Sequence, residues 1–478
     1  MRKAKILATL GPASREPVII EALLAAGVNG VRINMSHGAQ DEHAETIRRA
    51  RAAAETMKRP LAVLVDLSGP KIRTGVLKGG QPVKLEPNSL FTITTRSVAG
   101  DTREVSTNYA SMARDVRPGA RILLDDGLIE LYVERTTDTD VVCRVINGGI
   151  LGERKGINLP GVSLPIPSLT DKDRRDLQWA VRQGVDYIAL SFVRRAQDCI
   201  EAQSLIKSAG RRAPLIAKIE KAEAIDHLDE IIATADGLMV ARGDLGVETS
   251  VELVPVYQKS IIEKANNAGK LVITATQMLQ SMITNPRPTR AEASDVANAV
   301  WDGTDALMLS AETATGQYPI PAVATMARII ESAESGRKEE AGDLTRWAGK
   351  QSGRFSRALC EAAAFAAEEM DTKITAVFTE SGLMARRLAA LRPEQRIIAL
   401  TSSKDVRNEL ALIWGIEALI HSPCDQTEDL LRSGERALLE AGIAQQGELI
   451  VLMAGKLSGL GLSRSVKLHT LGDVEAQH

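Results

Sequence analysis

The feature that most constrains the fold is a regular alternation of short, β-branched apolar runs with amphipathic helical patterns. Eight runs are predicted to be strands: KILATLG (5–11), GVRINMS (30–36), LAVLVDL (61–67), VDYIALSF (185–192), LIAKIE (215–220), GLMVARGD (237–244), KLVITATQ (270–277) and ALMLSAE (306–312). They recur roughly every 24 to 36 residues, the length of one strand-plus-helix unit, apart from one long gap between 67 and 185. Eight such units predict a TIM (β/α)8 barrel with one inserted domain.

Two of the helices that follow these strands have clear start signals. Thr170 with Asp173, and Thr289 with Glu292, form the pattern of a capping box. In a capping box the side chains at the helix start satisfy backbone N–H groups that would otherwise lack partners. We therefore expect helices to begin directly after Thr170 and Thr289.

The insertion, residues 71–166, has a different pattern from the barrel. Short alternating segments such as PVKLE, LFTITTR and DVVCRVI are separated by Gly, Pro, Asn and Asp. This pattern predicts a small all-β barrel or sandwich. Its borders, SGPKIRTG and LPGVSLPIP, are rich in Gly and Pro, as connections between domains commonly are. We therefore expect a mobile lid over the mouth of the barrel.

Beyond about residue 340 the alternation starts again behind a polar stretch, ESGRKEEAGD. Four apolar runs, ITAVFTE, RIIALTS, IEALIHS and GELIVLM, are followed by SVKLHTL, which has no helical pattern before it. This predicts an open α/β sheet whose last strand is a candidate for antiparallel pairing. The expected domains are 1–70 and 167–340 for the barrel, 71–166 for the lid and 341–478 for the C-terminal α/β domain.

Charge and composition argue against several classes of partner. The net charge is −2 and the apolar fraction is 44%, so neither a nucleic acid nor a membrane partner is expected. The four cysteines lie far apart without a CxxC pair, which argues against a zinc site or a redox motif. No apolar stretch approaches the length of a transmembrane helix, and the start of the chain lacks a signal-peptide core. We expect a cytoplasmic protein.

The active site of a TIM barrel is built at the C-terminal ends of the strands, and here those ends are polar. They carry Arg32, Asn34, Ser36, Asp66, Lys218, Glu220, Asp244, Thr276, Ser310 and Glu312. Lys218 and Glu220 lie two residues apart in one strand, so their side chains point the same way. A buried charge costs several kcal/mol unless it is paired or binds a metal. An ion pair in the barrel core is the structural alternative, but so many polar strand ends favour a site.

Two of these residues are candidate metal ligands. Glu220 and Asp244 lie on consecutive strands and offer hard oxygen ligands, without a nearby His or Cys. Few protein ligands, with substrate oxygens supplying the rest, suit Mg²⁺ rather than zinc, and Mn²⁺ is the expected substitute. The glycines of RGDLG leave backbone N–H groups open at an expected helix start, where a small anion can bind.

A series of motifs then resembles one known family. RINMSHG, GPKIRTG, LLDDG, KGINLPG, IAKIE, VARGDLGVE, TATQML, NPRPTRAE and DGTDALMLSAETATG occur in this order. In order and spacing they resemble the pyruvate kinases, and most closely the bacterial, K⁺-independent subgroup. The resemblance covers nearly the whole chain and is looser in the C-terminal domain. It implies Mg²⁺-dependent phosphoryl transfer from phosphoenolpyruvate to ADP, giving pyruvate and ATP in the last step of glycolysis.

The resemblance also implies roles for single residues. Arg32 would bind the phosphate, and Lys218 would stabilise the transferring group and the enolate. Glu220 and Asp244 would hold Mg²⁺, and the substrate carboxylate would lie on Gly243, Asp244 and Thr276. The nucleotide would face Asn34, Ser36, His37, Arg73 and Lys155. A water-mediated relay through Thr276, Ser310 and Glu312 would protonate the enolate, with the final donor left open.

The potassium site of the family is altered in this chain. Many relatives need K⁺, held by groups that correspond to Asn34, Ser36, Asp66 and the backbone of Leu67. Where those relatives carry Thr, Lys and Glu, this chain has Leu67, Ser68 and Lys71. A lysine ammonium is itself a compact monovalent charge, tethered to the chain. We therefore expect Lys71 to substitute for K⁺ and K⁺ to be dispensable.

Assembly and regulation are expected by resemblance alone. The family is usually homotetrameric, and its C-terminal domain binds a phosphorylated effector. TESG (379–382) lies between an expected strand and helix, as a phosphate cradle would. Leu383 stands where many relatives have Arg, and the loop GKLSGLGLSRS (455–465) lacks their Thr/Asn cluster. We expect weak or absent activation by sugar bisphosphates.

Other interpretations remain open at this point. The rival functions are another Mg²⁺-dependent TIM-barrel enzyme of pyruvate or phosphoenolpyruvate chemistry, and a catalytically inactive metabolite-binding homologue. Asp125 and Asp126 of LLDDG form either a hairpin turn or part of the nucleotide surroundings. His227 and His421 are expected to be surface or filler residues.

Overall fold

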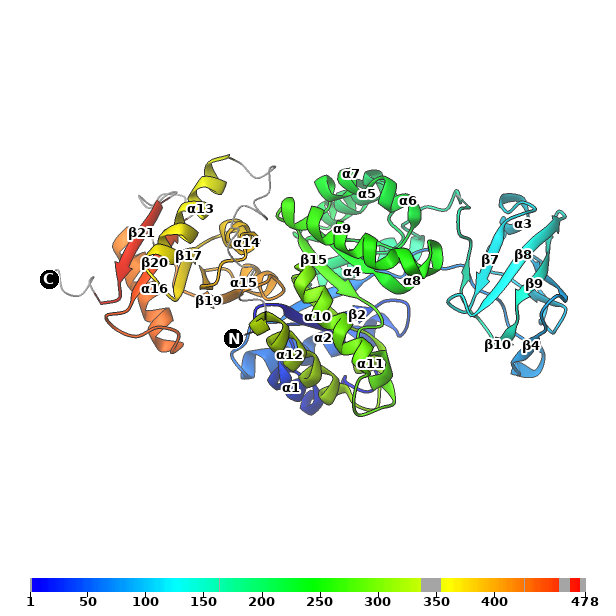
Figure 1. The fold of residues 1–478 in the computed structure, drawn as a ribbon, viewed down its shortest axis with the longest axis horizontal. Coiled ribbons are helices and arrows are strands. Elements are labelled where there is room, and N and C mark those ends of the chain that lie inside the picture. The colour runs from blue at the N-terminus through cyan, green and yellow to red at the C-terminus, as the bar shows by residue number, and fades with distance from the viewer. Residues whose placement is uncertain (1, 163, 337–353, 425, 455–464, 473–478) are drawn as a thin grey trace.

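The computed structural model describes residues 2–162, 164–336, 354–424, 426–454 and 465–472. Three units lie in a row, with the barrel between the C-terminal domain and the inserted lid (Figure 1). The expected boundary near residue 340 and residues 455–464 of the loop 455–465 lie outside the described residues, so the domain limits stay predictions. Within the described ranges, no helix is both long enough and apolar enough to cross a membrane.

The central unit is a closed parallel barrel. Its strands are β1 (Lys5–Thr9), β2 (Gly30–Asn34), β3 (Ala62–Asp66), β12 (Tyr187–Leu190), β13 (Leu215–Ile219), β14 (Gly237–Ala241), β15 (Leu271–Ala275) and β16 (Ala306–Leu309). They close in the order β1-β16-β15-β14-β13-β12-β3-β2, and every pairing is parallel. All eight predicted barrel strands are confirmed. Strand β12 pairs with β3 across the insertion, so the lid does not interrupt the barrel.

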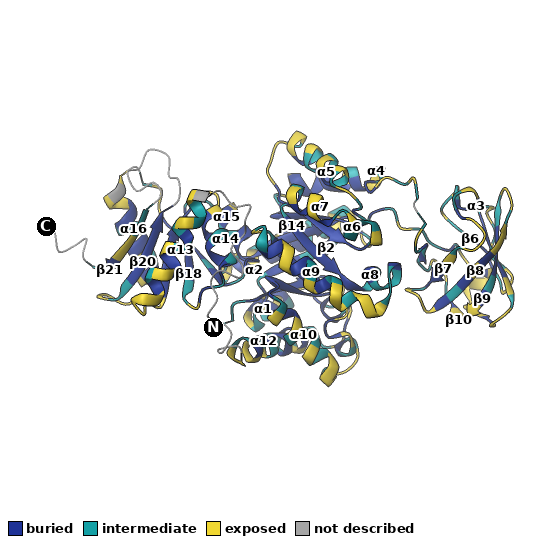
Figure 2. Cartoon of the chain, turned by 45° about the horizontal axis from the view of Figure 1, so that its top comes forward, coloured by how far each residue is buried: buried dark blue, intermediate teal, exposed yellow. Residues whose placement is uncertain are grey.

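Helices surround the barrel and bury the outer faces of its strands (Figure 2). They are α1 (Pro17–Ala26), α2 (Gln40–Thr56), α4 (Asp171–Arg182), α5 (Ala196–Ser208), α6 (Ala222–Asp226), α7 (Leu228–Thr234), α8 (Arg242–Glu248), α9 (Val254–Asn267), α10 (Arg290–Asp302), α11 (Ala311–Ala314) and α12 (Pro319–Gly336), with the 3₁₀ turns η2 (Val251–Leu253) and η3 (Gln280–Ile283). Both predicted capping boxes are present, at Thr170 before α4 and at Thr289 before α10. The predicted helix start after the sixth strand is α8.

The insertion, the predicted lid, is built mainly of strands, as its sequence pattern indicated. It contains η1 (Lys78–Gly80), β4 (Val83–Leu85), β5 (Leu90–Thr94), β6 (Glu104–Ser106), the short helix α3 (Met112–Asp115), β7 (Arg121–Leu124), β8 (Ile129–Thr136), β9 (Asp140–Asn147), β10 (Gly149–Leu151) and β11 (Ile157–Asn158). Six strands form a sheet in the order β11-β7-β8-β9-β5-β6, and β10 pairs with β4. The alternating apolar residues form a separate core that contains no residue of the barrel.

The C-terminal domain is an open α/β sheet. Its elements are α13 (Arg354–Glu369), β17 (Ile374–Phe378), α14 (Leu383–Ala390), β18 (Arg396–Thr401), α15 (Lys404–Leu410), β19 (Ile416–Ile420), α16 (Thr427–Glu440), β20 (Leu449–Ala454) and β21 (Ser465–Thr470). The strand order is β19-β18-β17-β20-β21. The last strand pairs antiparallel with β20, which confirms the prediction for SVKLHTL.

This domain closes the bottom of the barrel. Leu64 and Tyr187, inside the barrel, share one apolar cluster with Leu412 of the C-terminal domain. The Tyr187 hydroxyl donates to the backbone oxygen of Glu409 (2.6 Å). At Gly30 a Cβ would lie 2.8 Å from Cδ2 of Leu412, so the close approach requires glycine. The mouth at the opposite end, where the strands finish, is left for the lid.

Candidate active site

Lys218 lies at the centre of a buried cluster at the C-terminal ends of β2, β3 and β13. Its Nζ lies 2.7 Å from Oε1 of Glu220, 3.3 Å from Oδ1 of Asp66 and 2.7 Å from the Ser191 hydroxyl. The prediction that Lys218 and Glu220 point the same way is confirmed. Burial alone would lower the pKa of Lys218, but the charges of Asp66 and Glu220 outweigh it and raise that pKa. The ammonium therefore stays charged at any physiological pH.

Arg32 is oriented by Asp66. Its Nε and Nη2 lie 2.8 and 2.6 Å from Oδ2 of Asp66, and its Nη1 donates to the Thr9 hydroxyl (3.2 Å). Burial would raise the pKa of Asp66, yet Lys218 and Arg32 together hold it below its usual value. Asp66 thus pairs with Arg32 and Lys218, whereas Lys71 is exposed at the start of the lid.

Glu220 and Asp244 fit a divalent cation that takes part of its ligands from a substrate. Burial raises the pKa of the Glu220 carboxyl, and the nearby Asp244 charge adds to the rise. A cation between two acidic groups removes that repulsion. Among the described residues, no three His, Cys, Asp or Glu side chains are grouped to hold a metal. A metal at these two oxygen ligands therefore needs further oxygens from ligand or water, as Mg²⁺ commonly does.

Thr276 is held in an unusual backbone conformation next to α8. Its φ is +71°, in the left-handed region that β-branched residues rarely adopt. Its hydroxyl accepts from the N–H of Gly243 (2.7 Å) and donates to the oxygen of Ala275 (2.6 Å). The buried Arg242 donates to the Thr276 oxygen (2.7 Å) and pairs with Asp295. These hydrogen bonds hold Thr276 in its strained backbone conformation and place its hydroxyl at the first turn of α8, beside Asp244.

Glu312 fixes two loops. It is fully buried, and its oxygens accept from the backbone N–H groups of Ser310 (2.7 Å) and Leu279 (3.1 Å). Ser310 precedes α11, at the end of β16. Because both carboxylate oxygens already have donors, Glu312 supports the loops that carry Ser310 and Thr276. Its predicted part in a proton relay stays a prediction.

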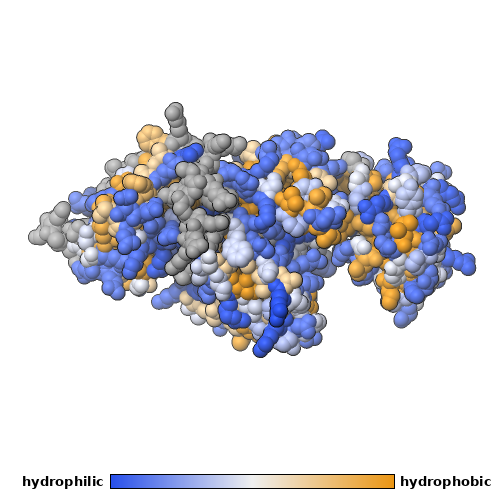
Figure 3. Space-filling model, in the orientation of Figure 1, coloured by the Kyte–Doolittle hydropathy of each residue, from blue (hydrophilic) through white to orange (hydrophobic). Residues whose placement is uncertain are grey.

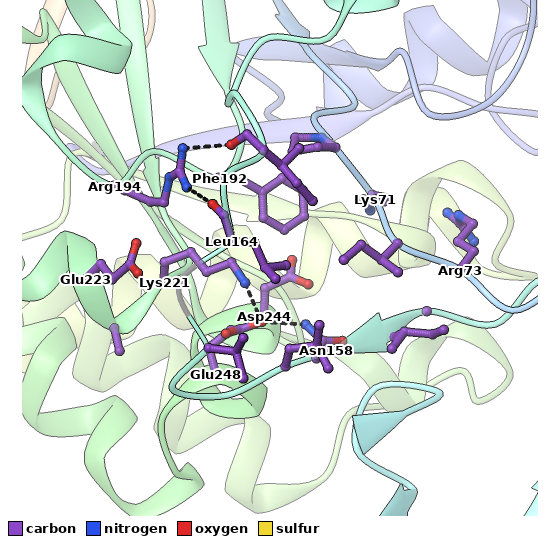
Figure 4. A pocket seen from close by; sticks show the side chains of 18 of the residues that line it. Lys71, Arg73, Asn158, Leu164, Phe192, Arg194, Lys221, Glu223, Asp244 and Glu248 are labelled. Carbon is purple, nitrogen blue, oxygen red and sulfur yellow. Dashed lines mark hydrogen bonds and ion pairs between the residues drawn. The ribbon is translucent and has the colours of Figure 1, made fainter. Parts of the chain in front are cut away.

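A cavity of about 540 Å³ lies between the barrel mouth and the lid (Figure 4). Of the predicted site residues it is lined by His37, Lys71, Arg73, Lys155 and Asp244. The Arg73 guanidinium donates to the backbone oxygen of Arg154 (3.0 Å), and Lys155 pairs with Asp125 (2.9 Å). Partial burial, together with the charges of Lys71 and Arg73, lowers the pKa of His37. Charged side chains of both signs therefore line the cavity from the lid and from the barrel, and Lys71, Arg73 and Lys155 are the cations on the lid side.

The four groups predicted for a potassium-type site already have protein partners. Oδ1 of Asn34 accepts from the N–H of Ser36, and the Ser36 hydroxyl accepts from that of Ser68 (3.0 Å). The oxygen of Leu67 accepts from the Ser191 hydroxyl (2.8 Å), and the Asp66 carboxylate is paired as described above.

Four further residues were singled out in the sequence: Asp125 and Asp126 as a hairpin turn or part of the nucleotide surroundings, and His227 and His421 as surface or filler residues. Asp125 and Asp126 form the turn between β7 and β8, with positive φ, and both line the cavity. His227 is partly exposed and pairs with Glu230 (2.9 Å). His421 is buried, with its ring 5.6 Å from that of Phe378. Both histidines are therefore surface or filler residues, as expected.

Sequence reasoning missed the turn after β12 and a contact between lid and barrel. The Ser191 hydroxyl accepts a hydrogen bond from Lys218, and the N–H of Phe192 donates one to Glu220. Arg194 donates to the backbone of the segment that follows the lid. Asn158 of the lid donates to Glu248 (2.9 Å), which also pairs with Lys221 (2.7 Å). The polar sequence SFVRR at the end of a barrel strand was the available signal. Its bonds through backbone atoms could not be inferred from side-chain types.

Family models and curated relatives match most of this chain. Residues 1–323 match the family model described as the pyruvate kinase barrel domain, and residues 357–467 match the pyruvate kinase alpha/beta domain. The chain is 43% identical over 480 residues to the pyruvate kinase of Geobacillus stearothermophilus, covering 100% of this chain and 81% of that protein. It is 43% identical over 473 residues to that of Mycobacterium tuberculosis, covering 99% of each.

A solved structure gives the same result in three dimensions. The crystal structure of a pyruvate kinase from Cryptosporidium parvum superposes with a TM-score of 0.91 at 34% identity, covering 98% of this chain and 96% of that one. The closed barrel and the C-terminal α/β domain agree with these matches. The chain belongs to the pyruvate kinase family.

Proposed function

We propose that the chain transfers the phosphoryl group of phosphoenolpyruvate to ADP at the mouth of the barrel, giving pyruvate and ATP. The observation that carries this proposal is the buried ion-pair cluster around Lys218, next to a cavity shared with the lid and lined there by Lys71, Arg73 and Lys155. Phosphoryl transfer needs positioning and charge stabilisation more than covalent chemistry. The cluster supplies fixed charges, and the lid forms one side of the cavity.

Three groups would act on phosphoenolpyruvate. Arg32, oriented by Asp66, would bind the phosphate, since a guanidinium matches phosphate oxygens geometrically. The ammonium of Lys218 would stabilise charge on the transferring group and on the enolate oxygen. The first turn of α8, at Gly243 and Asp244, together with the Thr276 hydroxyl, would orient the carboxylate.

Mg²⁺ is the cofactor that Glu220 and Asp244 suit best, with Mn²⁺ as its substitute. When bound, the ion would supply positive charge to the phosphoryl and carboxylate oxygens. The chain's own contribution is to hold Glu220 in place through the N–H of Phe192 (2.9 Å). Removal of divalent ions by a chelator should therefore abolish turnover.

The nucleotide would occupy the cavity. Lys71, Arg73 and Lys155 line it from the lid side, and their charge is opposite to that of a diphosphate. His37 would face the nucleotide from the barrel, and Asn34 and Ser36 lie in the segment before it. The enolate would then gain its proton from the side of Thr276 and Ser310, through water.

A pyruvate assay with and without ADP tests this function. With Mg²⁺ and phosphoenolpyruvate, pyruvate and ATP should appear in equal amounts, and only when ADP is present. Pyruvate released at the same rate without ADP would indicate a phosphatase or lyase and would overturn the proposal. Neither rival function considered above, a lyase or mutase or an inactive binding protein, is favoured by the named relatives.

We further propose that K⁺ is dispensable and that the chain forms a homotetramer. The potassium-type groups already have partners, and Lys71 lies at the edge of the cavity. The surface has hydrophobic patches among hydrophilic ones (Figure 3), and Val251 and Val256 are 76% and 59% exposed beside and on α9. Strand β21 is a sheet edge, which another copy can extend.

A phosphorylated effector would bind the C-terminal domain. TESG lies between β17 and α14, and Gly382 has a φ of +74° at the start of that helix, as a phosphate cradle requires. Residues 455–464 of the loop 455–465 lie outside the described residues, so weak or absent activation by sugar bisphosphates stays a prediction. The cytoplasmic location expected from the sequence also stays a prediction.

A further inference from the structure

The body of the lid touches the barrel sparsely. Across the described residues, the only hydrogen bond between lid strands and barrel joins Asn158 to Glu248 (2.9 Å). The buried lid core contains no residue of the barrel strands or helices, although Leu164 of the second connection packs against it, and Figures 1 and 2 show the lid joined to the barrel by two thin connections. With so few contacts of its own, the lid takes its orientation from those two connections.

Arg194 fastens the second connection to the barrel. Its Nη1 donates to the backbone oxygen of Leu164 and its Nη2 to that of Ile166, each at 2.7 Å (Figure 4). The planar guanidinium thus holds two carbonyls of one short segment in a fixed geometry. The Ser168 hydroxyl adds a bond to the oxygen of Phe192 (3.0 Å). The segment from Leu164 to Ser168 is therefore fastened to the barrel by the side chains of Arg194 and Ser168.

The same turn also meets the first connection. Gly69 has a φ of +66°, and its N–H donates to Oδ1 of Asp173 (3.1 Å). A Cβ at Gly69 would lie 2.4 Å from Cδ2 of Phe192, so the ring of Phe192 lies directly against this connection. The free part of the first connection therefore begins at Pro70. Both ends of the lid's hinge are set by the turn of residues 191–194.

This turn is bonded to the residues proposed to act in catalysis. The Ser191 hydroxyl accepts from Nζ of Lys218, and the N–H of Phe192 donates to Oε2 of Glu220. We propose that Arg194 is a positioning residue that fixes the axis about which the lid turns, so that Arg73 and Lys155 approach the barrel mouth in one orientation. The proposal rests on the proposed function for its kinetic consequence, but not for its structural one.

The structural test measures the lid directly. Spin labels at Ile150→Cys on the lid and Val18→Cys on α1, 70% and 74% exposed, report one lid-to-barrel distance. Cys424→Ser removes the cysteine that is not buried, since the other three are buried. In ligand-free protein, Arg194→Met should broaden the distance distribution by about twofold because one clamped end of the hinge is released. The control Arg195→Met, an exposed neighbour of equal charge, should leave it unchanged.

The kinetic test separates the hinge from the metal site. Arg194→Met should raise KM for ADP about tenfold and lower kcat, since misplaced lid cations bind the nucleotide poorly. The dissociation constant for Mn²⁺, measured on ligand-free protein by electron paramagnetic resonance, should stay within about twofold, because both metal carboxylates belong to the barrel.

Two results for Arg194→Met would overturn the proposed role of Arg194. One is a distance distribution as narrow as that of the parent protein, and the other is weakened Mn²⁺ binding with an unchanged KM for ADP. A variant that does not fold is replaced by Arg194→Lys, which keeps the charge but can hold only one carbonyl well. If the parent makes no pyruvate from phosphoenolpyruvate and ADP, the proposed function fails, and the distance measurement still tests the proposed role of Arg194.

Discussion

Burying the charge of Lys218 costs folding free energy, but it also fixes a positive charge in the candidate site. Lys218 is buried among apolar strands, and its charge is retained only because Asp66 and Glu220 face it. The Ser191 hydroxyl accepts a further hydrogen bond from the ammonium. A cation held this firmly needs no reorganisation when charge develops on a reacting group, which is the condition for strong electrostatic catalysis.

Replacing this residue tests its role. Lys218→Met should lower kcat by about 10³-fold or more, because the main electrostatic stabiliser of the transition state is lost. Binding of phosphoenolpyruvate, measured by calorimetry, should be largely retained. Lys207→Met, at an exposed position on α5, is the matched control and should retain full activity. A Lys218→Met enzyme that keeps more than about a tenth of wild-type kcat would contradict this role.

Lys71 leads to a second prediction at this scale. In tetramethylammonium buffer with Mg²⁺, adding K⁺ should stimulate activity less than about threefold, since a tethered ammonium already supplies the monovalent charge. Lys71→Glu should lower activity without K⁺ and restore part of the dependence on it. Reverting Leu67 and Ser68 as well tests whether the neighbouring positions contribute. Stimulation of the wild-type enzyme by about tenfold or more would show that Lys71 does not substitute for the ion.

At the scale of elements, strand ends were predictable and turns were not. Apolar periodicity located all eight barrel strands, and their polar ends located Arg32, Lys218 and Glu220. Asp66 was expected at a potassium-type site, but its partners Arg32 and Lys218 come from strands β2 and β13, which only the closed barrel brings together. The left-handed Thr276 and the backbone bonds of Phe192 depend on dihedral angles that residue types alone do not reveal.

Helix α10 offers an element-scale prediction. Its capping box pairs the Thr289 hydroxyl with the N–H of Glu292. Thr289→Ala should destabilise the first turn by about 1 kcal/mol. Faster hydrogen exchange of amides 290–294, followed by mass spectrometry, would report the loss. Thr289→Ser keeps the hydroxyl and should exchange like the wild type; equal exchange in Thr289→Ala would show that packing alone sets this helix start.

At the scale of the whole molecule, the junction between the barrel and the C-terminal domain contains a buried cation. Lys5 is 4% exposed and donates to the backbone oxygen of Ile416 (2.7 Å). Burial lowers the pKa of Lys5 from 10.5 to about 8, with the nearby charge of Arg2 adding to the decrease. Between these two values the unfolded chain binds more protons than the folded one, so this group's contribution to stability rises with pH through that window.

Lys5→Met should therefore raise Tm near pH 7. Relief of the burial cost, on the order of 3 kcal/mol for a shift of this size, exceeds the roughly 1 kcal/mol of the lost hydrogen bond. The gain relative to wild type should shrink or reverse at pH 10, where the wild-type lysine is neutral in the folded state. Thermal unfolding at both pH values, with Lys207→Met as control, measures this. A gain that is equal at both pH values would contradict it.

Assembly is the last prediction at this scale. Sedimentation velocity at micromolar concentration should give a tetramer, because β21 and the surface beside α9 offer two separate contact faces. A charge placed on one face should leave dimers: Val256→Asp on α9 removes one contact, and Leu468→Glu on β21 removes the other. A stable monomer of the wild-type chain would refute the tetramer.

The shared core beneath the barrel has a consequence for how the chain is made. Translation completes the last barrel strand at Leu309, but Leu412, which covers the bottom of the barrel, follows roughly 100 residues later. At about 5–20 residues per second this is a delay on the order of 5–20 s. During that time a nascent barrel presents Leu64 and Tyr187 to water at its open end. A ribosome-bound chain of this protein therefore exposes an apolar surface for several seconds. Synthesis of the C-terminal domain then covers that surface and completes the fold that began with residue 5.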